Sequence, residues 1–486
     1  MFNFSEIYNL YLELTNEFFQ RKTIEDIKER SQYFTPLEEA EKMMDDLQII
    51  EVETIRILDP ACGNGILLFK LLDKILSKYY PKNLTIDVYD IDIDLLNNVK
   101  KIMQTIRFAG TKLNIRFINT DFLKNVDNEK YDYIVMNPPY KKINVEMVPE
   151  NLKAFLYGQP NLYHLFITKA LDMLATNGIL CIISPKNYLS GKYTEKLRKY
   201  IVNDFSIIKI HTFNNRTTVF RNSITQEVCI IHIIKSDEEN VTISYNGDSK
   251  FQAKIDRIIL GNDTKILYTP RSIEDYRLIE KFKKFPLKTI GNDILMKTGK
   301  VVQFRVIGKD DNLKEEDYLH FENGIPLIVY RHINTNKLKY QPLVSKTKNK
   351  AITLVDDRSN SGVLIKNSNY VLIRKNIDKK YKKLIHSVGY LKDLESEKIA
   401  LDNGIAYFTN STDSLTREEV LGLQCILMSK QFDDYYRMIN SSHTINVYEL
   451  ENMYFPDLET IRSIGHHMIL NSLSIEQSTE VFKRYL

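Results

Sequence analysis

The sequence lacks the features that mark secreted, zinc-binding and membrane-spanning proteins. Its 486 residues include only four cysteines, which lie far apart and show no CxxC or His-rich spacing. No apolar stretch reaches the roughly 18 residues needed to cross a bilayer. The first residues also lack the basic start and unbroken apolar run of a signal peptide. We therefore expect a cytoplasmic protein with reduced cysteines, no metal site and no membrane contact.

A strong net charge is absent too. The chain has 67 Lys and Arg against 63 Asp and Glu, so its formal charge is only +4. Any basic surface must therefore come from an uneven distribution. Segment 281–350 holds 15 Lys and Arg against 7 Asp and Glu. Such a local excess suits contacts to phosphate groups, although a charge run is more often a solvated face.

What is present is a regular alternation of apolar strand-like runs and longer helical stretches between residues 55 and 235. Helical spacing occurs at 65–80, 95–108 and 161–175, with Gly178 as a plausible stop for the last helix. This rhythm predicts an α/β fold, an open and largely parallel doubly wound sheet with helices on both faces. The expected strands are TIRILDP, LTIDVYDID, NIRFINTDF, YDYIVMN, GILCIISP, FSIIKIHTF and QEVCIIHII.

The alternation is expected to stop after Lys235, where the sequence becomes polar and rich in turn residues. From about Leu267 onward, short strands, loops and two or three helices are expected, without a βα rhythm. The chain is thus predicted to have two domains: residues 1–255, and a mixed α+β domain over residues 256–486.

Three consecutive strand ends carry residues suited to binding an adenosine group. Segment 59–65 (DPACGNG) follows a strand and opens a helix, and its glycines allow close backbone approach to a ligand. Its spacing is not GxGxxG, so a dinucleotide pyrophosphate is not the natural ligand. Asp90 ends the second strand, where a carboxylate can bind ribose hydroxyls, and Asp92 is the neighbouring alternative. Asp121 and Phe122 end the third, where they can contact an adenine amino group and its ring.

The fourth strand ends in NPPY, residues 137–140. Two prolines cannot donate ladder hydrogen bonds, so the strand stops there and leaves carbonyl groups pointing to the cleft. The Asn137 side chain and the Pro138 backbone can each accept a hydrogen bond from one planar amino group, and Tyr140 can stack on the base that carries it. Such a site works by positioning and electrostatics. The alternative interpretation is a turn without catalytic meaning.

In this order, DPACGNG, a strand-end acid, DF and NPPY resemble the amino-methyltransferase branch of the class I S-adenosylmethionine enzymes. More narrowly, they resemble the γ-class (TaqI-type) adenine-N6 DNA methyltransferases of restriction–modification systems. Segment 32–36 (QYFTP) is similar to the xxTP motif of that family. The resemblance covers residues 30–235 strongly and the remainder by position. The chain departs from the usual Gly-Ser-Gly at residues 63–65, which read Gly-Asn-Gly.

The resemblance implies a class I S-adenosylmethionine methyltransferase fold, Rossmann-like, followed by a target-recognition domain. It also implies S-adenosyl-L-methionine as cofactor and double-stranded DNA as partner. The methyl group would go to N6 of a flipped-out adenine in a short recognition sequence. That would protect DNA from a cognate restriction endonuclease, expected to be a separate chain.

The resemblance also implies site residues. The target-base pocket would be Asn137, Pro138 and Tyr140, with Phe220 stacking opposite Tyr140. The other interpretation of Phe220 is a hydrophobic plug at a loop end. Segment 161–166 would line the same pocket. The cofactor contacts would be Thr35, Pro36, Asp59, Ala61, Gly63, Asp90, Ile91, Asp121 and Phe122.

In the C-terminal half, five residues are candidate DNA contacts. Arg305 and Arg331 can read guanine edges and Asn446 an adenine edge by bidentate hydrogen bonding. Lys300 lies in segment 297–305 with Arg305, and His443 lies in segment 441–446 with Asn446. Both segments resemble recognition loops of that family.

Other functions remain open on the sequence alone. NPPY also occurs in protein-glutamine and RNA amino-methyltransferases, but this chain has few residues ahead of the predicted sheet and a long half behind it. A catalytically inactive DNA-binding subunit of a restriction complex is another alternative, against which the intact motifs argue. We find no PD…(D/E)xK pattern typical of a fused nuclease.

Overall fold

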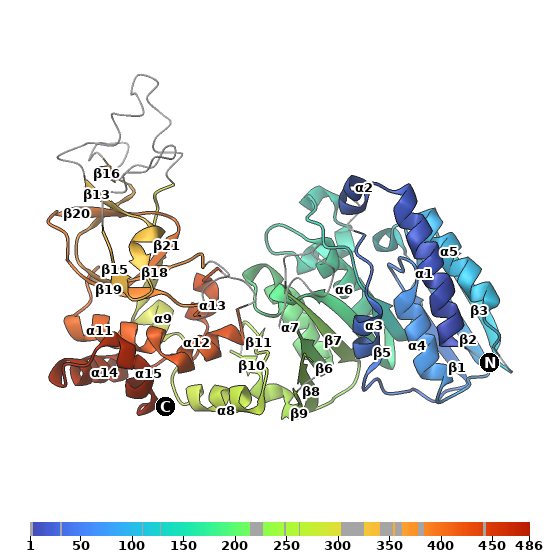
Figure 1. Cartoon of the computed structure of the whole chain (residues 1–486). Helices are drawn as coiled ribbons and strands as arrows, with labels where there is room; N and C mark the ends of the chain where they lie inside the picture. The colour runs from blue at the N-terminus through green and yellow to red at the C-terminus, as the bar shows by residue number, and fades with distance from the viewer. Residues whose placement is uncertain are drawn as a thin grey trace, which may run out of the picture. The chain divides into compact units, whose positions relative to one another are not determined.

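The computed structural model divides the chain into two compact units, Met1–Ile273 and Glu274–Leu486 (Figure 1). The boundary predicted from the sequence, after residue 255, lies 18 residues before this division. The structure describes residues 3–29, 32–108, 110–126, 128–213, 227–246, 249–261, 263–302, 325–340, 353–354, 362–377, 383–440 and 444–486.

The N-terminal unit is built on a nine-stranded sheet of order β3-β2-β1-β4-β5-β7-β6-β8-β9. The strands β1 to β5 run parallel to one another, and β7 is antiparallel to both β5 and β6. The alternating sequence therefore correctly predicts a doubly wound, largely parallel α/β sheet. The strands are β1 (Thr54–Asp59), β2 (Asn83–Tyr89), β3 (Lys112–Ile118), β4 (Tyr131–Met136), β5 (Leu174–Pro185), β6 (Ser206–Thr212), β7 (Val228–Ile234), β8 (Asn240–Tyr245) and β9 (Ser249–Lys254).

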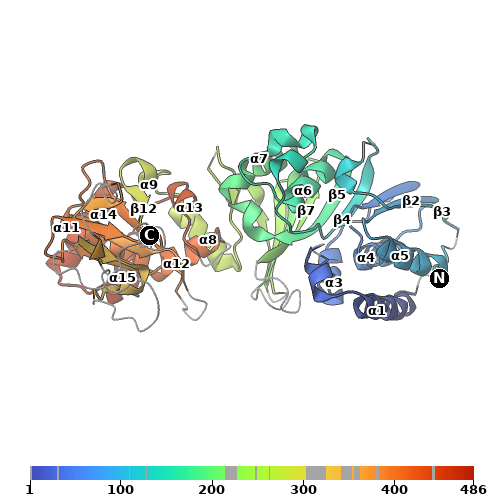
Figure 2. The ribbon, with the colours of Figure 1, turned by 90° about the horizontal axis from the view of Figure 1, so that it is seen from above.

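Helices cover both faces of this sheet, as its strands require. Every residue of β7 is buried, and five of the six residues of β4 are. Strands that are apolar on both faces need cover on both sides. In Figure 2, α4 (Ile66–Leu76), α5 (Ile93–Thr105) and α1 (Phe4–Arg21) lie on one side, and α6 (Leu162–Asp172) and α7 (Glu195–Asp204) on the other. The short helices α2 (Ile24–Glu29) and α3 (Leu37–Met44) connect α1 to β1.

One local expectation is wrong. Gly178 does not end a helix: α6 ends at Asp172, and Gly178 lies within β5. A Cβ atom there would stand 2.7 Å from the Tyr131 carbonyl oxygen, so close strand packing explains the glycine. The alternation of strands and helices does stop after Lys235, but the sheet continues with β8 and β9, which follow β7 without an intervening helix. The strand β8 adds to it beside β6, because Val241 and Ile243 are buried within an otherwise polar segment.

The C-terminal unit combines small sheets and helices, as a mixed α+β domain should. One sheet has the order β12-β21-β18-β19, a second has the order β16-β13-β20-β17, and β14 pairs with β15. From Ile273 onward, the described residues contain four helices of eight or more residues, α8, α11, α12 and α14, where the sequence predicted two or three. The helix α11 has little of the amphipathic pattern that reveals a helix in sequence, because nine of its residues are buried.

The elements of the second half have the following bounds. The strands are β10 (Ile259–Leu260), β11 (Ile266–Leu267), β12 (Leu295–Thr298), β13 (Ile325–Ile328), β14 (Ile333–Asn334), β15 (Lys337–Leu338), β16 (Thr353–Leu354), β17 (Leu364–Lys366), β18 (Asn369–Arg374), β19 (Ser387–Leu391), β20 (Lys398–Leu401) and β21 (Ile405–Thr409). The helices are α8 (Ile273–Phe282), α9 (Thr289–Asn292), α11 (Arg417–Met428), α12 (Lys430–Arg437), α13 (Val447–Glu451), α14 (Leu458–Leu470) and α15 (Ser478–Lys483).

Several sequence expectations concern thiols, metals and membranes. All four cysteines are buried free thiols. Within the described ranges, no group of three or more His, Cys, Asp or Glu side chains is arranged to hold a metal ion. No helix in the same ranges is both long and apolar enough to span a bilayer.

Candidate active site

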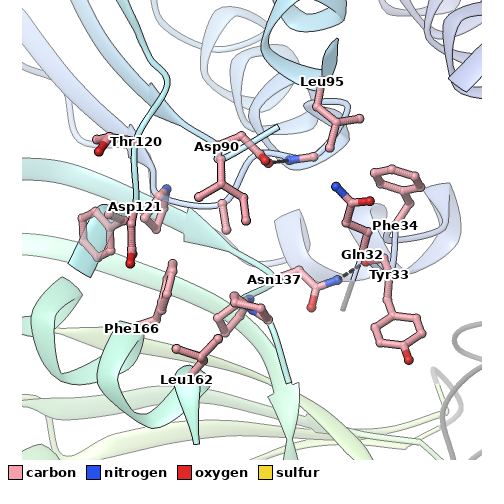
Figure 3. A pocket seen from close by; sticks show the side chains of 17 residues that line it. Gln32, Tyr33, Phe34, Asp90, Leu95, Thr120, Asp121, Asn137, Leu162 and Phe166 are labelled. Carbon is pink, nitrogen blue, oxygen red and sulfur yellow. Dashed lines mark hydrogen bonds between the residues drawn. The ribbon is translucent and has the colours of Figure 1, made fainter. Parts of the chain in front are cut away.

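A cavity of about 170 Å³ opens at the carboxyl ends of β1, β2, β3 and β4. This is the edge of an open α/β sheet at which ligands bind. In Figure 3, Leu162 and Phe166 of α6 lie on one side of the cavity and Tyr33 and Phe34 on the other. Eight of the residues predicted from the sequence line it: Ala61, Gly63, Asp90, Ile91, Asp121, Phe122, Asn137 and Pro138.

The loop after β1 gains its shape from its two glycines. Gly63 and Gly65 have φ angles of 54° and 87°, in the left-handed region that glycine adopts without strain. Gly65 is the residue before α4, and its amide donates to the Cys62 carbonyl oxygen at 2.8 Å. The Cys62 amide donates to the Tyr89 carbonyl oxygen at 3.0 Å. The loop is therefore tied to the end of β2, where Asp90 follows.

Asp90 is held in a defined position inside the cavity. One carboxylate oxygen accepts from the Gly63 amide and the other from the Asp92 amide, each at 2.9 Å. Burial raises the pKa of Asp90 to about 6, and these backbone hydrogen bonds oppose the shift. A carboxylate has about four acceptor positions, so each oxygen keeps capacity for a ligand hydroxyl.

Asp59 lies behind the loop and does not line the cavity. It is 1% exposed, and one of its oxygens accepts from the Ala61 amide at 3.3 Å. The other oxygen is buried without a hydrogen-bond partner among the described residues. Burial raises the pKa of Asp59 to about 8, and the nearby Asp90 adds to this increase. A carboxyl group with this pKa holds its proton at neutral pH.

Aromatic rings cover the end of the cavity nearest β3. Asp121 caps the short 3-10 helix Phe122–Lys124 by accepting from the Leu123 amide at 3.0 Å. Phe122 is buried, and its ring lies 5.3 Å from that of Phe166, centroid to centroid. Phe122 thus belongs to the core and to the cavity wall at once.

The NPPY segment presents its polar groups at the same edge. The Asn137 side-chain nitrogen donates to the Tyr33 carbonyl oxygen at 2.8 Å and to Thr35 Oγ1 at 3.1 Å. The Tyr140 hydroxyl donates to Asn137 Oδ1 at 2.7 Å and to the Ile183 carbonyl oxygen at 3.2 Å. Burial raises the pKa of Tyr140 well above its usual value, so this hydroxyl stays protonated.

The residues of the cavity fit S-adenosylmethionine. Asp90 offers acceptor capacity for ribose hydroxyls, and Phe122 and Phe166 offer apolar surface for an adenine ring. Gln32 lines the cavity, and its Nε2 donates to Asp92 Oδ2 at 3.2 Å. Its Oε1 is buried without a partner among the residues that the structure describes. An unpaired buried acceptor beside a cavity calls for a ligand that donates a hydrogen bond.

Tyr140 does not line this cavity, and three other predicted N-terminal residues do not line it either. Thr35 and Pro36, like Asp59, do not line the cavity, and Pro36 precedes α3 and accepts from the Ala40 amide. Phe220 lies outside the described residues. The sequence analysis missed Gln32, Phe34, Leu95 and Thr120, which do line the cavity. Gln32 and Phe34 lie within the segment 32–36 that is similar to the xxTP motif, and this is the signal that could have identified them.

The candidate DNA contacts have varied surroundings. Lys300 and Arg331 are exposed; Lys300 Nζ donates to the Gly362 carbonyl oxygen at 3.3 Å, and Arg331 Nε donates to the Tyr330 hydroxyl at 3.2 Å. Asn446 caps α13, because its Oδ1 accepts from the Tyr448 amide at 3.1 Å. Bidentate adenine recognition by Asn446 would need this oxygen. Arg305 and His443 lie outside the described residues.

Known proteins resemble this chain in sequence. Residues 9–220 match the family described as Eco57I restriction-modification methylase. The type II methyltransferase M.PstI of Providencia stuartii is 24% identical over 454 residues, which cover 88% of each chain. M.BsuBI of Bacillus subtilis, also named a type II methyltransferase, is 24% identical over 474 residues, 92% of each chain.

Among solved structures, the type IIL restriction-modification enzyme MmeI in complex with DNA covers 96% of this chain and 70% of its own, with 13% identity and a TM-score of 0.48. The family match and the two sequence relatives, together with the doubly wound sheet and its cavity, identify the chain as a relative of restriction–modification methyltransferases with a class I S-adenosylmethionine methyltransferase fold.

Proposed function

We propose that this chain is a site-specific DNA methyltransferase that transfers a methyl group from S-adenosylmethionine to N6 of adenine in a short recognition sequence. One observation carries the proposal. Asn137 and Pro138 directly follow β4 and line the same cavity as Asp90. Acceptors for an amino group thus adjoin a site suited to an adenosine-containing methyl donor.

S-adenosylmethionine supplies an electrophilic methyl group on a sulfonium sulfur. On the side of the protein, Asp90 would accept from the ribose hydroxyls. Asp121 would accept from the adenine amino group, and Ile91 and Phe122 would contact the ring. Gly63 and Ala61 would let the backbone approach the ligand closely, and Asp59 would support this loop by accepting from the Ala61 amide.

The target amine would be held by two acceptors. Asn137 Oδ1 already accepts from the Tyr140 hydroxyl, and a carbonyl oxygen has two lone pairs. One lone pair therefore remains for a target N–H, and the Pro138 carbonyl oxygen would accept the other. Acceptance of both N–H bonds favours a pyramidal nitrogen whose lone pair can attack. Transfer to the neutral amine yields a cation that loses its proton readily, so no general base is needed before attack.

The target base must leave the duplex, because its N6 is otherwise paired and stacked. Tyr140 would stack on one face of the extruded adenine, and Phe220 would stack on the other. The Tyr140 ring is fixed by the two hydrogen bonds of its hydroxyl and by edge contact with Tyr163, whose ring centroid lies 6.0 Å away. A rigid ring costs little side-chain entropy when the base binds.

DNA recognition would belong to residues 256–486 and catalysis to residues 1–255. Lys300 and Arg331 would contact phosphates or base edges as exposed cations, together with Arg305, His443 and Asn446. The biological role would be protection of the host DNA from a separate cognate endonuclease. Resistance of modified DNA to that enzyme would test this role.

The direct test uses the purified chain, S-adenosylmethionine and genomic DNA that lacks N6-methyladenine. Nucleoside mass spectrometry should detect N6-methyladenine, and the Asn137→Ala variant should produce none. Asn83→Ala is the matched control, because Asn83 begins β2, at the end of the strand away from the cavity, and its side chain donates to Thr54 Oγ1. N4-methylcytosine, methylated RNA or methylglutamine as the sole product would refute the adenine assignment.

A further inference from the structure

The Asn137 amide is held in one orientation by a segment more than 100 residues away in sequence. Its Nδ2 has two hydrogens, and it donates to the Tyr33 carbonyl oxygen and to Thr35 Oγ1. On the opposite side, Oδ1 receives the Tyr140 hydroxyl. All polar atoms of this amide therefore have partners of matching character (Figure 3 shows Asn137 turned toward Tyr33).

This orientation decides what the amide can bind. If the amide flipped, Oδ1 would face the Tyr33 carbonyl oxygen, which can only accept, and two acceptors would oppose each other. Nδ2 would then point toward the target amine, and two donors would meet. Only the observed orientation leaves an acceptor facing the target. Asn137 thus depends on its two partners in segment 33–35 to act on an amino group.

Thr35 is placed to serve this role rather than to contact the cofactor. Its side chain is buried, with 4% of its surface exposed, and it does not line the cavity. The residues just before it, Gln32 to Phe34, do line the cavity. The backbone immediately after it is fixed, because Pro36 accepts from the Ala40 amide at the start of α3. The Thr35 hydroxyl therefore contacts Asn137 from a stretch of backbone that is held in place.

We infer that Thr35 is a positioning residue that orients the amine-accepting amide of Asn137. This inference deepens the proposed function and rests on it. The Thr35 hydroxyl takes the second N–H of Asn137, which would otherwise be buried without an acceptor. The Tyr33 carbonyl oxygen takes the first. The xxTP motif would thus couple the cofactor side of the site to the acceptor of the target amine.

Thr35→Val tests this role, because valine keeps the shape of threonine and loses the oxygen. Loss of one hydrogen bond to the amide should lower kcat roughly five- to thirtyfold. The rate is measured as transfer of labelled methyl groups to genomic DNA lacking N6-methyladenine, with both substrates saturating. Thr35→Ser keeps the hydroxyl and should restore kcat to within about twofold of the wild-type value. The dissociation constant for S-adenosylmethionine, measured by calorimetry, should stay within about twofold in both variants, since Thr35 does not line the cavity.

Thr111→Val is the matched control. The Thr111 hydroxyl is also buried and donates to the Pro81 carbonyl oxygen at 2.7 Å, but Thr111 does not line the cavity. This variant should lose stability without losing kcat. If Thr35→Val does not fold, Thr35→Ala removes the same oxygen with less bulk and carries the same expectation.

Two results would overturn the inference. One is a wild-type kcat in a folded variant that lacks the hydroxyl. The other is weakened cofactor binding with kcat unchanged at saturation, which would make Thr35 a cofactor contact. A wild-type chain that methylates no DNA would instead overturn the proposed function, and the role of Thr35 with it.

Discussion

Cofactor affinity should depend on the ionisation of Asp90. This carboxyl group lines the cavity, and burial raises its pKa to about 6. Only the carboxylate can accept hydrogen bonds from both ribose hydroxyls while it also accepts from the Gly63 and Asp92 amides. Binding should therefore select the ionised form, and protonation should compete with the ligand.

The magnitude follows from that pKa. A pKa of about 6 leaves roughly one carboxyl group in ten ionised at pH 5 and nine in ten at pH 7. The dissociation constant for S-adenosylmethionine should then be about tenfold larger at pH 5 than at pH 7. Asp59, with its pKa raised to about 8, stays protonated throughout this window and should contribute little.

Isothermal titration at pH 5, 6 and 7 measures this dependence. Asp90→Asn should bind more weakly at pH 7 by roughly 10- to 150-fold, the value of a hydrogen bond to a charged group, and its affinity should not change with pH. Asp132→Asn is the control, because burial raises the pKa of Asp132 too, but this residue lies at the start of β4 and bonds to the Arg56 amide. Equal wild-type affinities at pH 5 and 7, or an unchanged pH dependence in Asp90→Asn, would refute the reasoning.

Three further predictions concern stability. Burial raises the pKa of Asp59 to about 8. Between about pH 4 and 8 the folded chain therefore holds a proton that the unfolded chain has lost. The contribution of Asp59 to the free energy of unfolding should fall by about 1.4 kcal/mol for each unit of pH increase in this window. Denaturant titrations of Asp59→Asn should lack this component, and an identical pH profile would contradict it. Asn64 Nδ2 donates to Thr15 at 2.9 Å and its Oδ1 accepts from Asn98 at 3.1 Å. Asn64→Ala should therefore lower the free energy of unfolding, measured by chemical denaturation, by about 1–3 kcal/mol. An unchanged free energy of unfolding would show that these hydrogen bonds do not stabilise the fold. A Cβ on Gly422 would stand 1.9 Å from the Ile461 carbonyl oxygen. Gly422→Ala should therefore push α11 away from α14 and lower the melting temperature, at a cost of about 1–3 kcal/mol or more. An unchanged melting temperature would refute this packing.

The sequence predicts the catalytic sheet well because its strands are short apolar runs separated by helices. Each of the seven expected strands is present, and the motifs lie at the strand ends where parallel topology gathers them. The strand β8 was missed because its two buried apolar residues, Val241 and Ile243, lie among polar ones. Gly178 was misread because a packing constraint from a neighbouring strand looks the same in sequence as a helix stop.

The site is only partly accessible to sequence reasoning. Motif spacing identifies Asp90 and Asn137, but the link between Asn137 and Thr35 spans 102 positions and follows from tertiary packing. That Gln32 Oε1 has no hydrogen-bond partner among the described residues likewise follows from burial in the folded chain. In the C-terminal unit, β13 pairs with β20 across more than 70 residues, and such short strands carry little periodicity.

The central claim is adenine methylation at one short sequence, and single-molecule sequencing tests it most directly. The chain and its Asn137→Ala variant would be expressed separately in a host that lacks adenine methylation. The account predicts N6-methyladenine at nearly every copy of one short motif with the wild-type chain and at none with the variant. An absence of N6-methyladenine from cells that contain folded, cofactor-binding wild-type protein would contradict it.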